Sequence, residues 1–376
     1  MKLIKATHFI IISTFLLISP ITAFKVVLSS PNATLGDGHD HDHGEYLEES
    51  NQWKNYFENL SGCAFGDEAQ GLARLKQYFH HFGYIDDHDE KLMNFSDVFD
   101  SALQSALKTY QTNFNLPPSG AIDAATLSQI LRPRCGVPDI INGSSTMNSG
   151  KPTNHNSLHS TAHFSFFPGQ PRWAPFQQSL TYAFFPGNNL TDPIKAVFRR
   201  AFSRWAAVTP LTFSEADSYP EADMKIGFFV GDHGDGEPFD GVLGTLAHAF
   251  SPPDGRFHLD GAEEWAVDGV GGVDLESVAV HEIGHLLGLG HSSVEEAIMF
   301  PTISSRRRKV ELARDDVEGI QVLYGENPRG GAAVPAAPTT QERERSSDES
   351  GGGRLRGGRR WGFWGGIVGV GVFILL

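Results

Sequence analysis

The sequence predicts an α+β protein with two domains, a small all-α domain and a larger domain that combines strands with helices. Three observations support this prediction. Apolar residues recur at helical spacing in three stretches between residues 46 and 131. Strand-like and helix-like stretches follow one another over residues 161–325. This second region also contains the pattern His281-Glu282-Ile-Gly-His285, which is typical of a helix.

The small domain is expected to contain three helices. The second is predicted to begin at an N-cap on Ser96, and the third at an N-cap on Asp123. Their apolar positions are Leu72, Leu75, Phe79 and Phe82, then Phe99, Leu103, Leu107, Tyr110 and Phe114, then Leu127, Ile130 and Leu131.

The larger domain begins with a strand region and ends with a helix. Asp274 is expected to open the helix that carries the histidine pattern, because aspartate is a favoured N-cap residue. The other expected elements are strand-like residues 166–169 and 180–184, a helix over 192–205, a strand over 223–230 and a closing helix over 315–324.

The histidine pattern extends to a third histidine and predicts a zinc site. His281 and His285 are four residues apart, so both imidazoles project from one face of a helix. Gly288 lets the chain turn back, and His291 then supplies a third ligand. Three protein ligands leave one zinc position open for water, and the neighbouring Glu282 can act on that water. The other interpretation is an amphipathic core helix with incidental histidines.

Two further segments match one class of zinc enzyme. Met299 lies downstream of the histidines, as in the metzincin endopeptidases. Far upstream, Cys135 lies in Pro133-Arg-Cys-Gly-Val-Pro-Asp139. With these motifs, roughly residues 60–325 resemble the matrix metalloproteinases (matrixins), of the plant type without a hemopexin domain. For Cys135, a structural disulfide with Cys63 is the other interpretation.

The resemblance implies both a fold and an activity. The fold is a metzincin-like catalytic domain, with a twisted mixed β-sheet, three α-helices and zinc in the cleft, after a small all-α prodomain similar to peptidoglycan-binding domains. The activity is hydrolysis of extended polypeptides, with Glu282 as general base and residues 245–247 pairing with the substrate. The Cys135 thiolate is expected to bind the catalytic zinc in a latent form, with Arg134 and Asp139 paired beside it.

The resemblance also implies two further metal sites. Three carboxylates match the family's calcium ligands, since oxygen ligands suit that hard cation. A second calcium site, which uses a residue like Asp223, is in doubt because the loop from His248 to His258 is short. The expected structural zinc ligands are His233, Asp235, His248 and His258, and the expected calcium ligands are Asp240, Asp260 and Glu263. For any one of the structural zinc ligands, the other interpretation is a surface histidine. For the calcium ligands, it is a solvated acidic loop.

The composition limits the kinds of partner. A net charge of −15 argues against nucleic acid as a ligand, and 40% hydrophobic content is ordinary for a globular chain. The only two cysteines both precede residue 160, so bound metal ions are a plausible source of rigidity for the second domain. We expect a monomer.

Both ends of the chain carry targeting signals. Residues 1–23 have a basic start, an apolar run and a small-residue end, as in a secretory signal peptide. At the other end, Ser350, a polar spacer and an apolar tail resemble a glycosylphosphatidylinositol (GPI) attachment signal over residues 351–376, with a short transmembrane anchor as the runner-up. In a secreted protein, Asn-x-Ser/Thr sequons are candidate glycosylation sites, and the sequence has five, at Asn32, Asn59, Asn94, Asn142 and Asn189.

These signals divide the chain. We expect a propeptide over residues 24–159, with its helical prodomain at about 46–131 and the cysteine segment at 133–139. Residues 140–160 are predicted to be an exposed linker that holds the activation cut. The catalytic domain spans 160–325, and a flexible stalk spans 326–350. The rival function is a metal-stabilised, non-catalytic surface binding protein, which the intact Glu282 disfavours.

Overall fold

The computed structural model describes residues 56–86, 95–147, 163–267, 271–303 and 307–329. All structural statements below refer to these residues, which belong to one compact unit. The signal peptide, Asn32, Asn94, Ser350 and the C-terminal tail lie outside them. Among the described residues, no helix is both long and apolar enough to cross a membrane.

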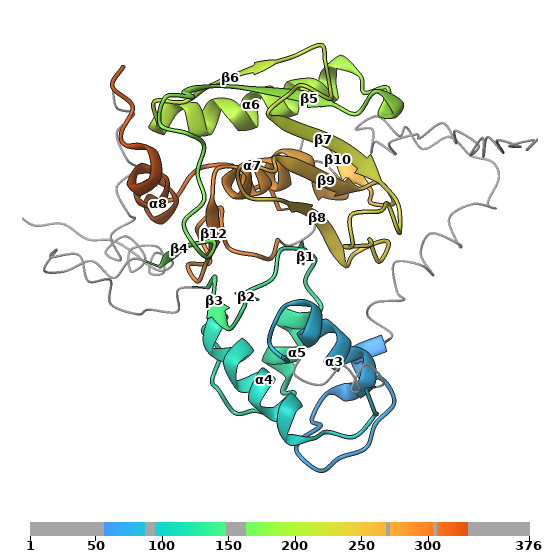
Figure 1. Ribbon diagram of the computed structural model, residues 1–376. Helices are drawn as coiled ribbons and strands as arrows, with labels where there is room; N and C mark the ends of the chain where they lie inside the picture. Colours follow the sequence, from blue (N-terminus) through green and yellow to red (C-terminus); the bar gives the residue numbers. More distant parts are fainter. Residues whose placement is uncertain (1–55, 87–94, 148–162, 268–270, 304–306, 330–376) are drawn as a thin grey trace, which may run out of the picture. The chain divides into compact units, whose positions relative to one another are not determined.

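The prodomain contains the three predicted helices (Figure 1). A short 3-10 turn, η1 (Glu58–Leu60), precedes them. The helices are α3 (Leu72–His81), α4 (Ser101–Asn113) and α5 (Ala124–Ile130). Their apolar stripes meet in one core, where the rings of Phe79 and Tyr110 lie 5.3 Å apart. The helical spacing of the sequence is therefore confirmed.

The helix starts were predicted with mixed success. Asp123 caps α5, since its carboxylate accepts a hydrogen bond from the Thr126 N–H at 2.8 Å. The N-cap predicted at Ser96 is wrong, because α4 begins five residues later. Asp100 caps it, accepting from the Leu103 N–H at 2.9 Å. Phe99 is thus a buried residue just before the helix.

A six-stranded mixed sheet forms the framework of the catalytic domain (Figure 1). The order is β1-β8-β9-β7-β5-β6, and only the β8–β9 pair is antiparallel. The edge strand β1 comes from the cysteine segment, so the propeptide extends the sheet of the catalytic domain. The strands are β1 (Arg134–Cys135), β5 (Ser179–Phe184), β6 (Thr212–Glu215), β7 (Met224–Phe229), β8 (Thr245–Ala249) and β9 (Arg256–Asp260).

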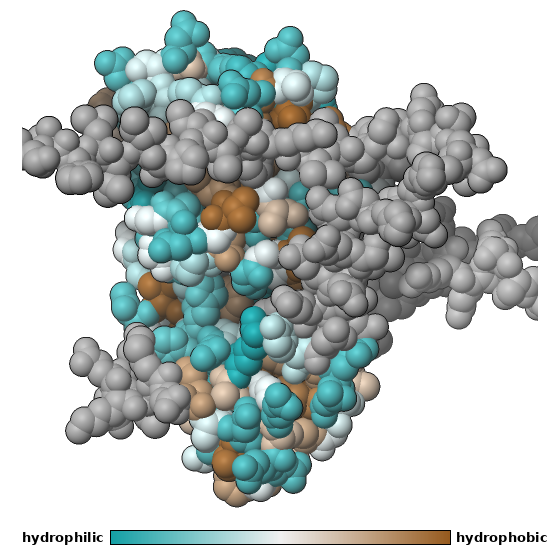
Figure 2. Space-filling model, turned by 90° about the vertical axis from the view of Figure 1, so that its right-hand side faces the viewer, coloured by the Kyte–Doolittle hydropathy of each residue, from teal (hydrophilic) through white to brown (hydrophobic). Residues whose placement is uncertain are grey.

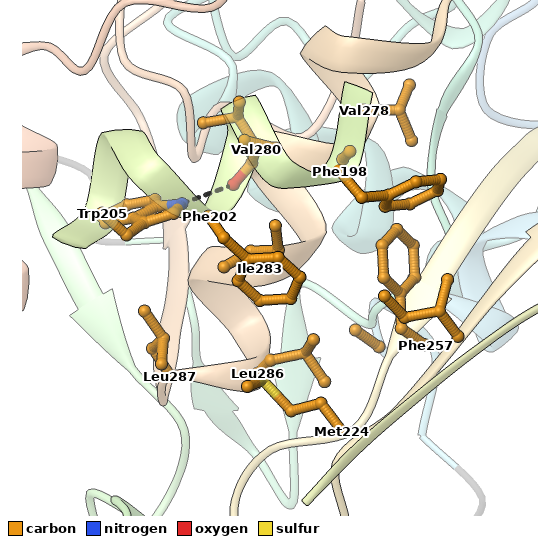
Figure 3. Packing of buried hydrophobic residues seen from close by; sticks show 14 of the residues in the cluster. Phe198, Phe202, Trp205, Met224, Phe257, Val278, Val280, Ile283, Leu286 and Leu287 are labelled. Carbon is orange, nitrogen blue, oxygen red and sulfur yellow. Dashed lines mark hydrogen bonds between the residues drawn. The ribbon is translucent and has the colours of Figure 1, made fainter. Parts of the chain in front are cut away.

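Three helices complete the predicted α+β fold. They are α6 (Asp192–Val208), α7 (Leu275–Leu286) and α8 (Arg314–Tyr324). Residues of α6, α7 and the sheet share one hydrophobic core, in which Phe198 and Phe257 are buried (Figure 3). The Trp205 indole N–H donates to the Val280 carbonyl at 2.9 Å, so α6 is bonded to α7 one residue before the first histidine of the motif (Figure 3).

Short strand pairs fix the remaining segments. β4 (Phe164–Phe166) pairs with β12 (Leu289–Ser292), and β10 (Trp265–Ala266) pairs with β11 (Val273–Asp274). A 3-10 turn, η3 (Pro186–Asn188), follows β5. On the face shown in Figure 2, hydrophilic residues predominate among the described part of the chain, and apolar residues form separate small patches. This is ordinary for the surface of a folded domain.

The linker prediction needs a correction at its start. β2 (Ile140–Ile141) and β3 (Ser144–Ser145) form a hairpin, so residues 140–147 are ordered. Asn142 and Gly143 make its turn with φ angles of 50° and 72°, as an Asn-Gly hairpin requires. Met147 is 1% exposed and packs in the prodomain core. The polar composition of this segment predicts a loop, whereas its Asn142-Gly143 pair is the signal for a hairpin turn. Residues 148–162 lie outside the described part.

Candidate metal centres and active site

The histidine motif is assembled by the end of α7. Asp274 caps this helix as predicted, accepting from the Ser277 N–H at 2.8 Å. His281 and His285 project from one face, with their Nε2 atoms 3.1 Å apart. Gly288 then turns the chain at a φ of 100°, where a Cβ would lie only 2.1 Å from the Pro171 carbonyl oxygen. The turn leads directly into β12, which carries the third histidine.

All three imidazoles are held by hydrogen bonds at Nδ1. His281 bonds the Ile298 carbonyl at 2.7 Å, and His285 bonds the Leu289 carbonyl at 2.8 Å. His291 bonds the Asp139 carboxylate at 2.9 Å. Burial lowers the pKa of each ring, which favours the neutral form that binds metal. Each Nε2 is therefore left to face the common centre.

Cys135 reaches this centre from the propeptide. Its Sγ lies 3.5 Å from His285 Nε2, and the four ligand atoms of Cys135 and the three histidines all lie within 4.8 Å of one another. The Val137 N–H donates to the sulfur at 3.3 Å. Both Cys135 and Cys63 are free thiols, so a disulfide between them is excluded. One sulfur and three imidazole nitrogens fit a closed tetrahedral zinc shell.

Two buried groups at this centre have no protein partner. His291 Nε2 and both carboxylate oxygens of Glu282 make no hydrogen bond to another described residue. Buried polar atoms are nearly always satisfied, so these atoms fit a bound metal ion and its ligands. Burial also raises the pKa of Glu282 to about 8. A carboxylate with a raised pKa is suited to accept and return a proton near neutral pH.

A second group of ligands lies on the opposite face of the sheet from the hydrophobic core. The β8–β9 register places His248 directly opposite His258, with both side chains turned away from the face that carries Ala247 and Phe257 in the core. His233 comes from the loop after β7. The Asp235 Oδ2 atom lies 2.9, 2.8 and 2.7 Å from nitrogens of His233, His248 and His258 respectively. Three imidazoles and one carboxylate fit a structural zinc ion.

A group of three carboxylates lies at the same end of the sheet. Burial and mutual repulsion raise the pKa of Asp260 to about 6 and that of Glu263 to about 8, with Asp240 contributing to both. Asp260 Oδ2 and Glu263 Oε2 are buried without a hydrogen-bond partner among the described residues. Such a cluster fits a hard divalent cation. Asp223, by contrast, accepts bonds from Gln177 and Thr181, which agrees with the doubt about a second calcium site.

The predicted substrate strand and a cavity adjoin the histidines. In the structure, β1 occupies the free edge of β8, with the Gly136 N–H donating to the Ala247 carbonyl at 2.8 Å. On the other side of β1, the Cys135 N–H donates to the Pro301 carbonyl at 2.9 Å. A cavity between α7 and the segment after Met299 is lined by Ser277 and Lys309.

The structure adds residues that the sequence analysis did not single out. Lys309 enters the pocket, and its backbone N–H donates to the Ser277 hydroxyl at 2.7 Å. The Tyr84 hydroxyl donates a hydrogen bond to the Asp139 carboxylate at 2.8 Å, although Tyr84 precedes Asp139 by 55 residues. No local pattern marks either residue. Of the five sequons, the described Asn59, Asn142 and Asn189 are exposed.

Comparison with known proteins gives a consistent result. The matrixin family model matches residues 172–325, and a putative peptidoglycan-binding domain model matches residues 68–130. Metalloendoproteinase 5-MMP of Arabidopsis thaliana is 55% identical over 323 residues, covering 83% of this chain and 85% of the relative. Metalloendoproteinase 2-MMP of the same plant is 53% identical, covering 77% and 80%. Human matrix metalloproteinase-20 is 40% identical, covering 62% and 44%.

The matches span the prodomain, the cysteine segment and the catalytic domain described above. Matrixins are extracellular zinc metalloendopeptidases that bind catalytic zinc, structural zinc and calcium, and the two histidine groups of this structure agree with that requirement. With its fold, its metal-binding groups and its relatives in agreement, this chain belongs to the matrixin family of zinc metalloendopeptidases.

Proposed function

We propose that this chain is a secreted, cell-surface zinc endopeptidase that cleaves extracellular proteins and is made as a latent proenzyme. The observation that carries the proposal is the position of Cys135, whose sulfur lies among the three histidines while β1 occupies the edge of β8. One short segment thus covers both the metal position and the strand on which an extended substrate would pair. The enzyme acts as a monomer.

The catalytic residues follow from the geometry. His281, His285 and His291 hold the catalytic zinc through Nε2, with their Nδ1 atoms fixed by hydrogen bonds. When bound, zinc polarises the scissile carbonyl and lowers the pKa of a water molecule. Glu282 accepts the proton of the attacking water at a carboxylate oxygen and returns it to the leaving amine.

Latency is supported by docking of the whole prodomain as well as by the sulfur. Asn115 of the prodomain donates to the Ser293 carbonyl at 2.7 Å, and Gln129 donates to the Thr302 hydroxyl at 3.0 Å. The rings of Phe114 and Phe300 pack edge to face at 5.6 Å. After a cut between residues 148 and 162, non-covalent contacts such as these would hold the prodomain on the catalytic domain.

The remaining metals hold the catalytic domain together. His233, Asp235, His248 and His258 bind the structural zinc, and this ties the loop after β7 to β8 and β9. Calcium bound by Asp240, Asp260 and Glu263 ties the start of β8 to the end of β9. Since the catalytic domain has no disulfide, these ions supply its cross-links.

The cell-surface part of the proposal rests on the two ends of the sequence. Residues 1–23 direct secretion, and glycans are attached at the sequons. A GPI lipid is attached at Ser350 after removal of residues 351–376, which places the enzyme on the outer leaflet. Phosphatidylinositol-specific phospholipase C should release the protein from intact cells. Retention with residues 361–376 still present, measured by mass spectrometry, would support a transmembrane anchor instead.

The decisive test of the activity is a cleavage profile of the purified chain on a peptide library. We expect no cleavage before the propeptide is removed, and cleavage in extended peptides afterwards. A zinc chelator should abolish it, and added zinc should restore it. A processed, zinc-loaded protein that cleaves no peptide would support the rival binding function.

A further inference from the structure

The three zinc-ligand histidines differ in what holds their Nδ1 atoms. His281 and His285 bond main-chain carbonyls of the catalytic domain, at Ile298 and Leu289. His291 alone bonds a carboxylate, that of Asp139, at 2.9 Å. Asp139 belongs to the propeptide and precedes its partner by 152 residues. One of the three ligands is therefore oriented by a group that leaves when the enzyme matures.

Asp139 is built into the propeptide so that it can face the histidine. Its side chain is 0% exposed. Oδ1 accepts from Arg134 Nη2 at 2.8 Å as well as from His291, and Oδ2 accepts from the Tyr84 hydroxyl at 2.8 Å. The Tyr84 oxygen in turn accepts from Asn113 at 3.1 Å. The carboxylate is thus fixed by Tyr84 of the prodomain and by Arg134 of the cysteine segment, and Asn113 of α4 holds Tyr84 in turn.

We propose that Asp139 is a positioning residue for the catalytic zinc, which holds His291 in its ligating orientation and strengthens its bond to the metal in the proenzyme. The inference rests on the proposed zinc ligands and latency. A carboxylate that accepts the second ring N–H of a zinc-bound histidine fixes its tautomer and raises its basicity. Loss of such a partner reduces metal affinity by about 10–100-fold.

The propeptide therefore acts on the zinc in two ways. Cys135 acts on the metal directly, and Asp139 acts through His291. Both lie in the segment 133–139, so they leave together when the propeptide is removed. The mature enzyme keeps the two carbonyl-bonded histidines unchanged, but its third ligand loses the carboxylate. The proenzyme therefore binds zinc more tightly than the mature enzyme does, and the difference in affinity is larger than loss of the Cys135 sulfur alone would cause.

Two substitutions in one ion pair separate this role from a structural one. Arg134→Gln and Asp139→Asn both break the pair between Arg134 Nη2 and Asp139 Oδ1. Only Asp139 contacts His291. Each change is made in the full chain that also carries Glu282→Gln, so that the proenzyme cannot process itself. Zinc loss to an excess of a coloured chelator is timed, and the visible spectrum of the cobalt-substituted protein is recorded.

We expect Asp139→Asn to lose zinc about 10–100-fold faster than its parent and to shift the visible bands of cobalt. Arg134→Gln should stay within about threefold of the parent. Equal acceleration in both variants, or none in Asp139→Asn, would overturn the inference. If Asp139→Asn does not fold, the Cys135→Ser proenzyme provides the test instead, because it lacks the sulfur ligand but keeps Asp139. That proenzyme should hold zinc more tightly than the processed catalytic domain, and equal retention would overturn the inference.

The same samples separate this inference from the proposed latency. A sulfur-to-cobalt charge-transfer band should be present in the parent proenzyme and absent in Cys135→Ser. Its absence from the parent would contradict the cysteine ligand and with it the proposed function. A normal band together with unchanged zinc loss in Asp139→Asn would contradict the role of Asp139 alone.

Discussion

Gly284 of α7 lies directly against the sulfur of Met299. A Cβ atom at position 284 would be 2.3 Å from Met299 Sδ and 3.1 Å from the Trp205 ring. Both distances are shorter than ordinary van der Waals contact. The helix that carries His281 and His285 therefore approaches the methionine turn as closely as it does because position 284 has no side chain.

Gly284→Ala should destabilise the protein even though alanine is the better helix former. In an exposed helix this change stabilises by about 1 kcal/mol. Here the added methyl group must displace Met299 or the helix, and such overpacking costs about 1–3 kcal/mol. Thermal unfolding of the zinc-loaded protein would show a lower melting temperature. An unchanged or higher melting temperature would mean that the methionine turn is not held against the helix in this way.

Glu282→Ala should remove activity without unfolding the site. The carboxylate is buried, and its neighbour Cys135 leaves with the propeptide, so we expect the processed fold to tolerate its loss. We expect peptide cleavage by the processed enzyme to fall at least about a hundredfold, the usual scale for loss of a general base. Zinc content and the melting curve serve as controls. Near-full activity in a zinc-loaded variant would show that another group takes the proton.

Cys135→Ser should weaken latency. The variant loses the sulfur that lies 3.5 Å from His285 Nε2, but it keeps the other contacts of the docked prodomain. We expect faster self-processing than in the wild type and no further acceleration by mercurials. Cys63→Ser, which removes the other free thiol, is the matched control and should behave like the wild type. Equal processing rates in all three proteins would argue against the cysteine ligand.

Acid should weaken docking of the prodomain through His81. Burial and the neighbouring Arg134 lower the pKa of His81 to about 4, and its Nδ1 lies 3.5 Å from Glu237 of the catalytic domain. In a released prodomain, which the catalytic domain no longer covers, the pKa of His81 should lie closer to the ordinary value of about 6.5. Docking therefore has its full stability above pH ~6.5 and loses it as the pH falls toward 4.

The measurement is the rate at which a thiol reagent modifies Cys135 between pH 7 and pH 4.5. In the wild type, protonation of His81 should loosen the prodomain, so Cys135 should react faster as the pH is lowered. The His81→Gln variant cannot bind this proton, so its rate should rise less, and the ratio of its rate to the wild-type rate should fall. His80→Gln, on the same helix, controls for the substitution itself. Parallel pH profiles in wild type and His81→Gln would assign the acid sensitivity to other groups.

Calcium should stabilise the catalytic domain through Glu263. Burial raises the pKa of Glu263 and of Asp260, and repulsion adds to it, from Asp260 and Asp240 on Glu263 and from Asp240 on Asp260. A bound cation would remove that repulsion. We expect calcium to raise the melting temperature of the wild type and to have a much smaller effect on Glu263→Gln. Zinc content should be unchanged, and Glu264→Gln, at the exposed neighbouring position, should respond like the wild type.

Much of the local structure follows from short-range patterns. The helical spacing of apolar residues located α3, α4 and α5, and the aspartates at 123 and 274 marked two helix starts. The misplaced start of α4 shows the limit of such signals. Ser96 is a good capping residue by type, but Asp100 is the one whose carboxylate meets the free backbone N–H groups.

The sequence by itself determined the zinc site within one segment. His281, His285 and His291 are close in the chain, so helix geometry and one glycine turn are enough to bring them together. The antiparallel register of β8 and β9, by contrast, is a tertiary feature, and this register places His248 opposite His258. Only the tertiary structure decided that Cys135 meets His285 and that Asp139 meets His291, because these contacts join residues about 150 positions apart. Packing of the propeptide against the catalytic domain brings such residues together, and no local spacing encodes that packing.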